Sequence, residues 1–346
     1  MLSTRLPVAT AVFAALCLAP LAATQTPAQP AIPAAAQTPA PPPVYVPTSL
    51  AAEPGLPRTP DGHPDFQSAV WATNFFPVFE ATPMAASLVV SEAEGKKMID
   101  TMVAGMKKMP GFDLDPEAHD IIGSTDGLPI VRGERRTRLI VLPADGKLPM
   151  APDTRKSVAG SDPMDGPKDD YEQRPSSERC LVLSGNPPVY ALISYNRMRI
   201  VQTPGHVVIH NENGDEARII PFAAEHKPAG PKSWYGDSIA RWDSDTLVVE
   251  TTRQNPKNRV RGLMSKFIVN EDATVTERFT RLSKDELLYQ FTIVDPKVYT
   301  APWLGEFSFY AADTGMFPFA CHEHNYSLPN ILQGARVAEA RAAKKP

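Results

Sequence analysis

The sequence predicts a mainly β fold, in which an antiparallel meander of short strands closes into a lipocalin-like barrel. After Cys180, apolar and β-branched runs follow one another closely and are separated by turn-forming residues. No helical periodicity interrupts them, which disfavours the crossovers of a parallel sheet. Because a meander of this length must curl or close to hide its edge strands, we expect a closed or nearly closed barrel, with a two-layer sandwich as the alternative.

Residues 1–23 are typical of a secretory signal peptide. Arg5 supplies a positive charge, residues 8–18 form an apolar run, and residues 21–23 offer a small-residue cleavage site. The run is too short, and too interrupted by proline, for a stable membrane span, so we expect no membrane span after signal removal. We therefore expect a periplasmic or secreted protein.

Residues 24–56 are dominated by Pro, Ala, Thr and Gln, and such a segment cannot bury enough apolar surface to fold. We expect it to be a disordered tether, followed by a single β-rich domain over residues 57–346.

Helices are expected near the start and at the end of this domain. Ser91 and Glu94 form a capping box, which predicts a helix running to about Lys108. Asp115 followed by Pro116 predicts a second short helix over 116–122. Residues 328–342 predict a C-terminal helix that covers one end of the sheet.

Strands fill most of the remainder, interrupted by one long surface loop over 151–177, which is rich in Asp, Pro, Ser and Gly. A β-branched run over 137–142 precedes that loop. The other expected strands are 189–194, 197–202, 206–210, 217–221, 239–242, 246–252, 266–269, 275–282, 287–294 and 305–311.

Composition and motifs exclude several classes of function. The net charge is −4 and both signs are mixed, so nothing resembles a nucleic-acid footprint. The sequence contains no P-loop, dinucleotide glycine fingerprint, G-x-S-x-G elbow or H-E-x-x-H motif. Phosphoryl transfer, nicotinamide chemistry and the common serine hydrolases are therefore disfavoured, and we expect no cofactor.

Two cysteines remain after signal removal, Cys180 and Cys321. In an oxidising compartment a lone, distant pair favours a disulfide over a metal site. The bridge would close a loop of about 140 residues, which the chain-entropy model makes stabilising by several kcal/mol. If it forms, Cys321 is neither a nucleophile nor a ligand.

The densest group of reactive side chains is the hexapeptide CHEHNY at 321–326. If it is extended, His322 and His324 share a face and supply two ligands to a metal such as zinc. The third ligand would come from His206, His210, Asp237 or Glu250. In the metal-free alternative, His322 and Glu323 act as general acid and base. In the third interpretation the hexapeptide only caps strand ends.

Other segments supply weaker candidates. The hexapeptide would lie near Arg179 if the bridge forms, which would combine a guanidinium, an imidazole and a carboxylate. Trp234, Asp237 and Arg241 form either a pocket wall or an aromatic core with a buried ion pair. Tyr195 lies in a hairpin turn, where it could donate a proton at the barrel mouth. His206 and His210 are about 13 Å apart if they lie on a strand, too far to share one metal ion.

Several segments occur in an order that resembles a large group of exported proteins of unknown function from Acidobacteria and Proteobacteria. They are PRTPDG (57–62), ERC (178–180), IVQTPGH (200–206), GDS (236–238), DTLVVETT (245–252), ERFTR (277–281) and CHE (321–323). The resemblance covers most of residues 57–336 and implies export but no activity. Position 324 is usually not histidine in that group, which favours His322 with Glu323 over a metal site.

Together these features predict an exported β-barrel enzyme that acts on a small, partly apolar organic molecule. The expected chemistry is metal-independent acid–base catalysis of the lyase, dehydratase or isomerase type. The alternatives are a non-catalytic periplasmic carrier or sensor and a structural envelope protein. The candidate catalytic residues are His322, Glu323, Arg179, Tyr195 and Asp237, and the candidate ligand contacts are His206, Trp234, Arg241, Asn325 and Tyr326.

Overall fold

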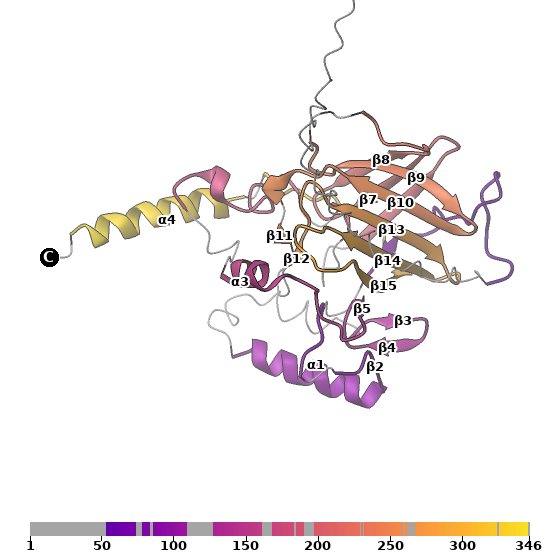
Figure 1. Cartoon of the computed structure of the whole chain (residues 1–346), viewed down its shortest axis with the longest axis horizontal. Helices are drawn as coiled ribbons and strands as arrows, with labels where there is room; N and C mark the ends of the chain where they lie inside the picture. The colour runs from indigo at the N-terminus through magenta and orange to yellow at the C-terminus, as the bar shows by residue number, and fades with distance from the viewer. Residues whose placement is uncertain are drawn as a thin grey trace, which may run out of the picture. The chain divides into compact units, whose positions relative to one another are not determined.

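One antiparallel sheet of ten strands dominates the computed structural model (Figure 1). Its strands follow the order β8-β7-β6-β1-β15-β14-β13-β10-β9, and β5 also pairs with β15. The strands are β1 (Trp71–Ala72), β5 (Ile140–Leu142), β6 (Arg197–Gln202), β7 (His206–Asn211), β8 (Glu216–Pro221), β9 (Asp237–Asp243), β10 (Thr246–Thr252), β13 (Thr274–Arg281), β14 (Glu286–Val294) and β15 (Trp303–Ala311).

The structure describes residues 53–73, 78–83, 86–108, 127–160, 168–182, 185–189, 197–228, 230, 232–258, 260–261, 267–323 and 325–344. All of them belong to one unit, Pro42–Pro346. The predicted signal peptide, the helix over 116–122 and most of the strand over 189–194 lie outside the described residues.

The prediction of a mainly β, antiparallel fold is confirmed, but closure into a barrel is not. Within the described ranges, no sheet closes on itself. The edge strands β8 and β9 approach each other where Phe222 forms a parallel bridge with Ala240 and the Ala223 N–H donates to the Ala240 carbonyl at 3.4 Å. Pro221 ends β8 and has no N–H to extend the ladder. We call this junction the β8–β9 seam.

Aromatic side chains fill the inner face of the curled sheet. Tyr289 lies at the centre of the cluster, with its ring centroid 4.9 Å from that of Phe279 and 5.0 Å from that of Phe307. Phe291 and Phe309 complete the ring contacts of Tyr289, each at 5.7 Å. Because successive strand residues alternate between faces, these rings share one face. The inside of the sheet is therefore a packed core.

The core also contains a buried ion pair. Arg218 of β8 pairs with Glu277 of β13, and both side chains are almost fully buried. The Tyr289 hydroxyl donates to Glu277 at 2.8 Å and accepts from the Val189 N–H at 2.8 Å. Burial, followed by the charge of Glu277, raises the pKa of Tyr289 well above its usual value. The pair links an edge strand to the middle of the sheet.

Smaller elements cover the outside. A three-stranded sheet of β2 (Val89–Val90), β4 (Glu134–Arg136) and β3 (Ile130–Val131) lies near β15, with α1 (Glu92–Met106) on its other side (Figure 1). The Ser91–Glu94 capping box opens α1 as predicted. Arg132 and Arg136 reach the buried Glu306 of β15. A two-stranded sheet pairs β11 (Val260–Arg261) with β12 (Phe267–Ile268).

The segment predicted as a long loop over 151–177 is partly helical, so that prediction is wrong in part. It contains α3 (Pro152–Gly160) and the 3-10 turn η2 (Tyr171–Gln173), and a second 3-10 turn, η3 (Pro256–Asn258), follows β10. The C-terminal helix α4 (Ser327–Ala342) is present, although it buries none of its residues. No described helix is long and apolar enough to cross a membrane.

Candidate functional site

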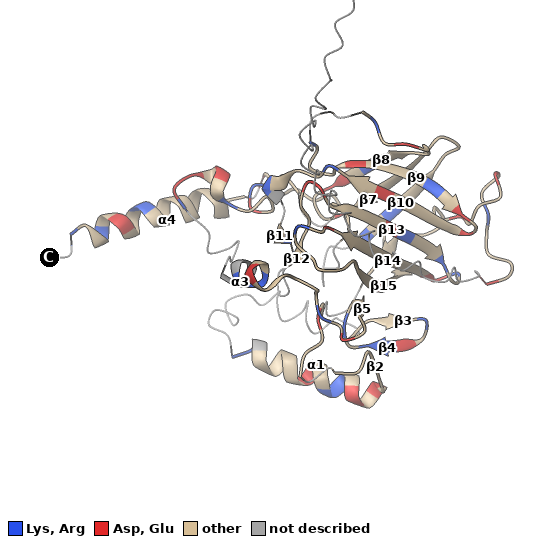
Figure 2. Cartoon of the chain, viewed as in Figure 1, with Lys and Arg blue, Asp and Glu red and all other residues tan. Residues whose placement is uncertain are grey.

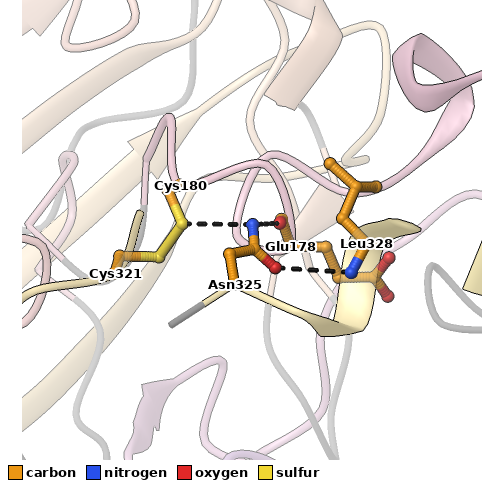
Figure 3. The surroundings of a disulfide bond; sticks show 5 residues. All are labelled: Glu178, Cys180, Cys321, Asn325 and Leu328. Carbon is orange, nitrogen blue, oxygen red and sulfur yellow. Dashed lines mark hydrogen bonds between the residues drawn. A yellow bond between two sulfur atoms is a disulfide. The ribbon is translucent and has the colours of Figure 1, made fainter. Parts of the chain in front are cut away.

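The predicted disulfide between Cys180 and Cys321 is present (Figure 3). Beside it, the Asn325 side-chain amide donates to the Glu178 carbonyl at 2.6 Å and lies 3.4 Å from the Cys180 sulfur. The Asn325 Oδ1 accepts from the Leu328 N–H at 3.3 Å, at the start of α4. Asn325, predicted to contact a ligand, thus joins the disulfide to the first turn of α4.

The bridge brings 178–180 beside 321–325, but it does not assemble the predicted composite site. Arg179 lies over the Tyr171 ring, 5.5 Å from its centroid, and its guanidinium donates to the Glu172 carbonyl at 3.5 Å. Among the described residues, no hydrogen bond or ion pair joins Arg179 to His322 or Glu323, whose side chains are exposed.

The remaining predicted site residues belong to other elements or lie outside the described chain. Tyr195 and His324 are outside it. His206 starts β7 with an exposed side chain, and Tyr326 is 68% exposed before α4. Trp234 is half-buried before β9, while Arg241 is exposed within β9. Only Asp237 and Arg241 share one strand face, as expected for residues four apart.

Asp237 forms the charged centre of a cluster that we call the His226 centre. His226 Nδ1 lies 2.8 Å from Asp237 Oδ2, and His226 Nε2 lies 3.2 Å from Glu250 Oε1. Arg253 pairs with the same Asp237 oxygen at 2.8 Å. His226 and Asp237 are each about one-fifth exposed and Glu250 is 42% exposed, so the centre is open to solvent on the Glu250 side.

The backbone explains how distant residues converge here. Asp237 begins β9 and Glu250 lies on the neighbouring strand β10, on the same outer face. The chain after β8 returns along β9 from the Phe222–Ala240 bridge and brings His226 to that face. Arg253 also donates to the Lys227 carbonyl at 2.7 Å, which fixes the backbone beside His226.

Gly236 allows β9 to start this close to β10. Its φ is +72°, and a Cβ there would lie 2.5 Å from the Thr252 carbonyl oxygen. A larger residue is therefore excluded on both conformational and steric grounds. The Gly-Asp pair at 236–237 is thus a geometric requirement of the His226 centre.

The centre is suited to proton transfer. A neutral imidazole carries one N–H, so it cannot donate to both carboxylates at once. The Nε2–Oε1 contact needs one proton, either on the ring or on Glu250. Asp237, held by Arg253, orients the ring from the opposite side, which is the arrangement that general acid–base catalysis uses. No group of three or more His, Cys, Asp or Glu side chains in the described ranges is arranged to hold a metal ion.

An open cleft of about 440 Å³ lies further along the same strand, at the β8–β9 seam. Residues 222–224 and 240–242 line it, together with Asp61, His63 and Pro204. The His63 ring stacks on Trp242 with 4.1 Å between centroids and an interplanar angle of 5°. Because Ala224 lines the cleft two residues before His226, the cleft adjoins the His226 centre in the chain.

A turn over 57–63 holds His63 against Trp242. Arg58 forms two hydrogen bonds of 2.8 Å with Asp245 and a third of 2.7 Å with the Gly62 carbonyl. The hydrogen bond from Arg58 lowers the pKa of Asp245, and the hydrogen bond from Thr59 lowers that of Asp61. We call the Arg58–Asp245 pair the latch. The sequence placed only the start of the β-rich domain here.

Sequence reasoning missed His63, His226 and Arg253. His63 directly follows the Pro-Asp-Gly turn, and His226 lies in a loop between Pro221 and Pro228. A histidine in a proline-bounded loop after a strand was the available signal, since loops on rigid scaffolds often carry function. Both signs of charge occur on α1, α4 and the large sheet (Figure 2), so charge alone does not mark the site.

Comparison with known proteins does not identify the chain: no protein-family model, curated protein or solved structure matches it. The resemblance to exported proteins of unknown function stays a prediction. The geometry of the seam therefore carries the functional argument.

Proposed function

We propose that the protein is an exported enzyme that transfers protons to and from a small, partly apolar organic molecule. The chemistry is metal-independent acid–base catalysis of the lyase, dehydratase or isomerase type. The observation that carries this proposal is His226, which lies between two carboxylates and two residues along the chain from Ala224 of the open cleft. A positioned acid–base pair of this kind accelerates proton transfer by about 10²–10⁴-fold.

Each residue of the centre has a separate role. Glu250, the most exposed member, exchanges the proton with the substrate, and His226 receives or returns it through Nε2. Asp237 keeps the ring oriented through Nδ1, and Arg253 keeps Asp237 in place. The proton removed from the substrate in the first half of the reaction is available for return in the second, so no external acid is consumed.

The sheet in this proposal is lipocalin-like in outline, but its ligand binds at the β8–β9 seam. Two observations support that location. Aromatic rings and the Arg218–Glu277 pair occupy the inner face. The seam, in contrast, contains the cleft, and Ala224 of its lining lies two residues before His226.

The disulfide end is the second candidate location, with His322 and Glu323 as acid and base. Their exposed side chains, without a hydrogen-bond partner in the described ranges, favour it. Export in either case rests on the predicted signal peptide, and the Cys180–Cys321 bridge supports it, because disulfides persist in oxidising compartments.

The test is a metabolite-profiling experiment. The purified protein is incubated with small-molecule extract from the periplasm of the source cells, and substrate loss and product gain are followed by mass spectrometry. Wild type and His210→Asn should convert the same compound, because among the described residues the His210 ring pairs with Asp215 alone, on an exposed turn. His226→Asn should lower the rate at least about 10²-fold. Equal rates for His226→Asn and wild type would refute the proposal.

The same material distinguishes a carrier from an enzyme. A compound that co-purifies with the protein in native mass spectrometry, and that neither wild type nor any variant converts, identifies a non-catalytic carrier or sensor. Metal analysis of the chelator-free preparation tests the metal-independent part, since a stoichiometric metal that the reaction requires would contradict it.

A further inference from the structure

The cleft presents two charged side chains that lack an ionic partner. Arg241 is exposed and forms no ion pair with any carboxylate in the described part of the chain. Asp61 accepts a hydrogen bond from the Thr59 hydroxyl at 2.5 Å but pairs with no described cation. In contrast, other charged groups nearby are matched: Arg58 pairs with Asp245 and Arg278 with Asp243. Within the cleft lining, Arg241 and Asp61 are therefore the charged side chains without an ionic partner among the described residues.

The rest of the lining is apolar or aromatic. Phe222, Pro204 and the alanines at 223, 224 and 240 supply the apolar surface. Trp242 is fixed by Phe66 and Phe222, whose ring centroids lie 5.8 and 6.3 Å away, and His63 covers its exposed face. Such a wall is rigid and binds an apolar body, while the two charges select its polar groups.

We propose that the cleft binds a small hydroxy acid with an apolar body. Arg241 binds the carboxylate through two parallel hydrogen bonds, the geometry that a guanidinium prefers. The Asp61 carboxylate accepts a hydrogen bond from the substrate hydroxyl. The apolar body of the substrate contacts Phe222 and Pro204. This inference rests on the proposed function, whose substrate it names by class.

The position of Arg241 relative to the His226 centre agrees with this assignment. Arg241 and Asp237 lie on the same face of β9, four residues and therefore about 13 Å apart along the strand. In this proposal the acid bound by Arg241 extends along the same face of β9 toward the His226 centre.

Three matched probes test the inference: 3-phenyllactate, 3-phenylpropanoate and 3-phenylpropanamide. They share one apolar body and differ in the hydroxyl and in the charge. Binding is followed by the indole N–H resonance of Trp242, assigned with Trp242→Phe. Phenyllactate should bind at least tenfold more tightly than the amide and measurably more tightly than phenylpropanoate. Arg241→Gln should reduce phenyllactate binding to the level of the amide.

Arg199→Gln is the matched control, since Arg199 is an exposed strand arginine outside this cleft. It should leave all three dissociation constants unchanged. Equal binding of acid and amide by wild type, or an unchanged phenyllactate constant in Arg241→Gln, would overturn the carboxylate assignment. Equal binding of phenyllactate and phenylpropanoate would overturn the hydroxyl assignment.

His226→Asn separates this inference from the proposed function. It should retain the wild-type dissociation constant for phenyllactate, because His226 is not one of the groups that bind the carboxylate or hydroxyl. If His226→Asn also retains conversion of the natural substrate, the proposed function fails while the binding preference stands. If wild type shows no preference among the probes, this inference fails whatever the turnover result.

Discussion

At the residue scale, the two carboxylates beside His226 differ in how firmly they are held. The Asp237 carboxylate forms an ion pair with Arg253 as well as contacting His226, and it is mostly buried. Glu250, in contrast, has no partner other than His226 among the described side chains. A carboxylate held on its second side orients the imidazole without leaving its position. A more exposed carboxylate can exchange its proton with a bound molecule. The asymmetry assigns Asp237 to positioning and Glu250 to proton exchange.

Asp237→Asn is expected to lower the conversion rate by about 10²-fold while leaving probe binding in the cleft unchanged. The amide keeps the size of the side chain but removes the charge that fixes the ring. The initial rate and the phenyllactate dissociation constant, measured on the same preparation, check this. Asp215→Asn is the control, since Asp215 contacts His210 in a similar pair on an exposed turn. A normal rate in Asp237→Asn would contradict the positioning role.

At the element scale, the 57–63 turn reaches the sheet through the latch. Arg58 and Asp245 are 187 residues apart in the sequence, and Asp245 lies in the tight turn between β9 and β10. The latch therefore couples the N-terminal turn to the strand that carries Trp242, and it sets the position of His63 in the cleft.

The latch should stabilise the fold in a pH-dependent manner. The folded-state pKa of Asp245 is lowered from 3.8 mainly by the hydrogen bond from Arg58. Its stabilisation is therefore complete above about pH 4 and is lost as the pH falls through the lowered value. The stability difference between wild type and Arg58→Gln in urea unfolding should be larger at pH 6 than at acidic pH, where only the loss of the Arg58 hydrogen bond to the Gly62 carbonyl remains. A difference that persists unchanged at low pH would contradict this account.

The sequence predicts some elements better than others. The difference depends on whether the residues that specify an element lie close together in the sequence. The Ser91–Glu94 capping box specifies the start of α1 within four residues, so α1 was predictable. β1 comprises only Trp71 and Ala72 yet lies between β6 and β15 in the middle of the sheet. Two residues carry no periodicity, so their place depends on partners that are far away in the sequence.

The same reasoning applies to the candidate site. His226, Asp237 and Glu250 are each 11 to 13 residues from the next, and their contact requires the β9–β10 register and the return of the chain after β8. Asp237 and Arg241 could be proposed from residue type alone. The residues that contact Asp237 could not be proposed in this way. No pattern in the sequence predicts which strand the loop after β8 will lie against.

At the scale of the whole molecule, two sets of interactions between residues far apart in the sequence stabilise the fold. The Cys180–Cys321 bridge joins positions 141 residues apart, and the Arg218–Glu277–Tyr289 network links β8 to the centre of the sheet. The disulfide lowers the conformational entropy of the unfolded chain. The network provides hydrogen-bond partners for polar groups that are buried in the native state. The two contributions can be separated experimentally.

Replacing both bridged cysteines by serine should lower the free energy of unfolding by about 4–5 kcal/mol, as the chain-entropy model predicts for a loop of this length. Denaturant unfolding of the double variant checks this, and wild type in reductant should match it. In hydrogen exchange, α4 should lose protection before the sheet does, because α4 buries none of its residues. An unchanged stability would contradict the predicted role of the bridge.

Tyr289 should make the fold sensitive to alkali. Its folded-state pKa is raised above the usual 10 by burial and by Glu277, so its stabilising contribution is intact below pH 10 and declines as the pH rises beyond it. Above pH 10, Tyr289→Phe should reduce the loss of unfolding free energy by up to about 1.4 kcal/mol per pH unit. Tyr171→Phe, at an exposed position, is the matched control. Identical slopes in all three proteins would contradict the buried network.

The central claim is that the reaction takes place at the β8–β9 seam and not at the disulfide end. The most direct measurement compares His226→Asn with His322→Asn for conversion of the natural substrate under identical conditions. The seam account predicts that His226→Asn loses at least about 10²-fold in rate and that His322→Asn retains the wild-type rate. The reverse result, a normal His226→Asn and an inactive His322→Asn, would contradict it and locate the chemistry beside Cys321.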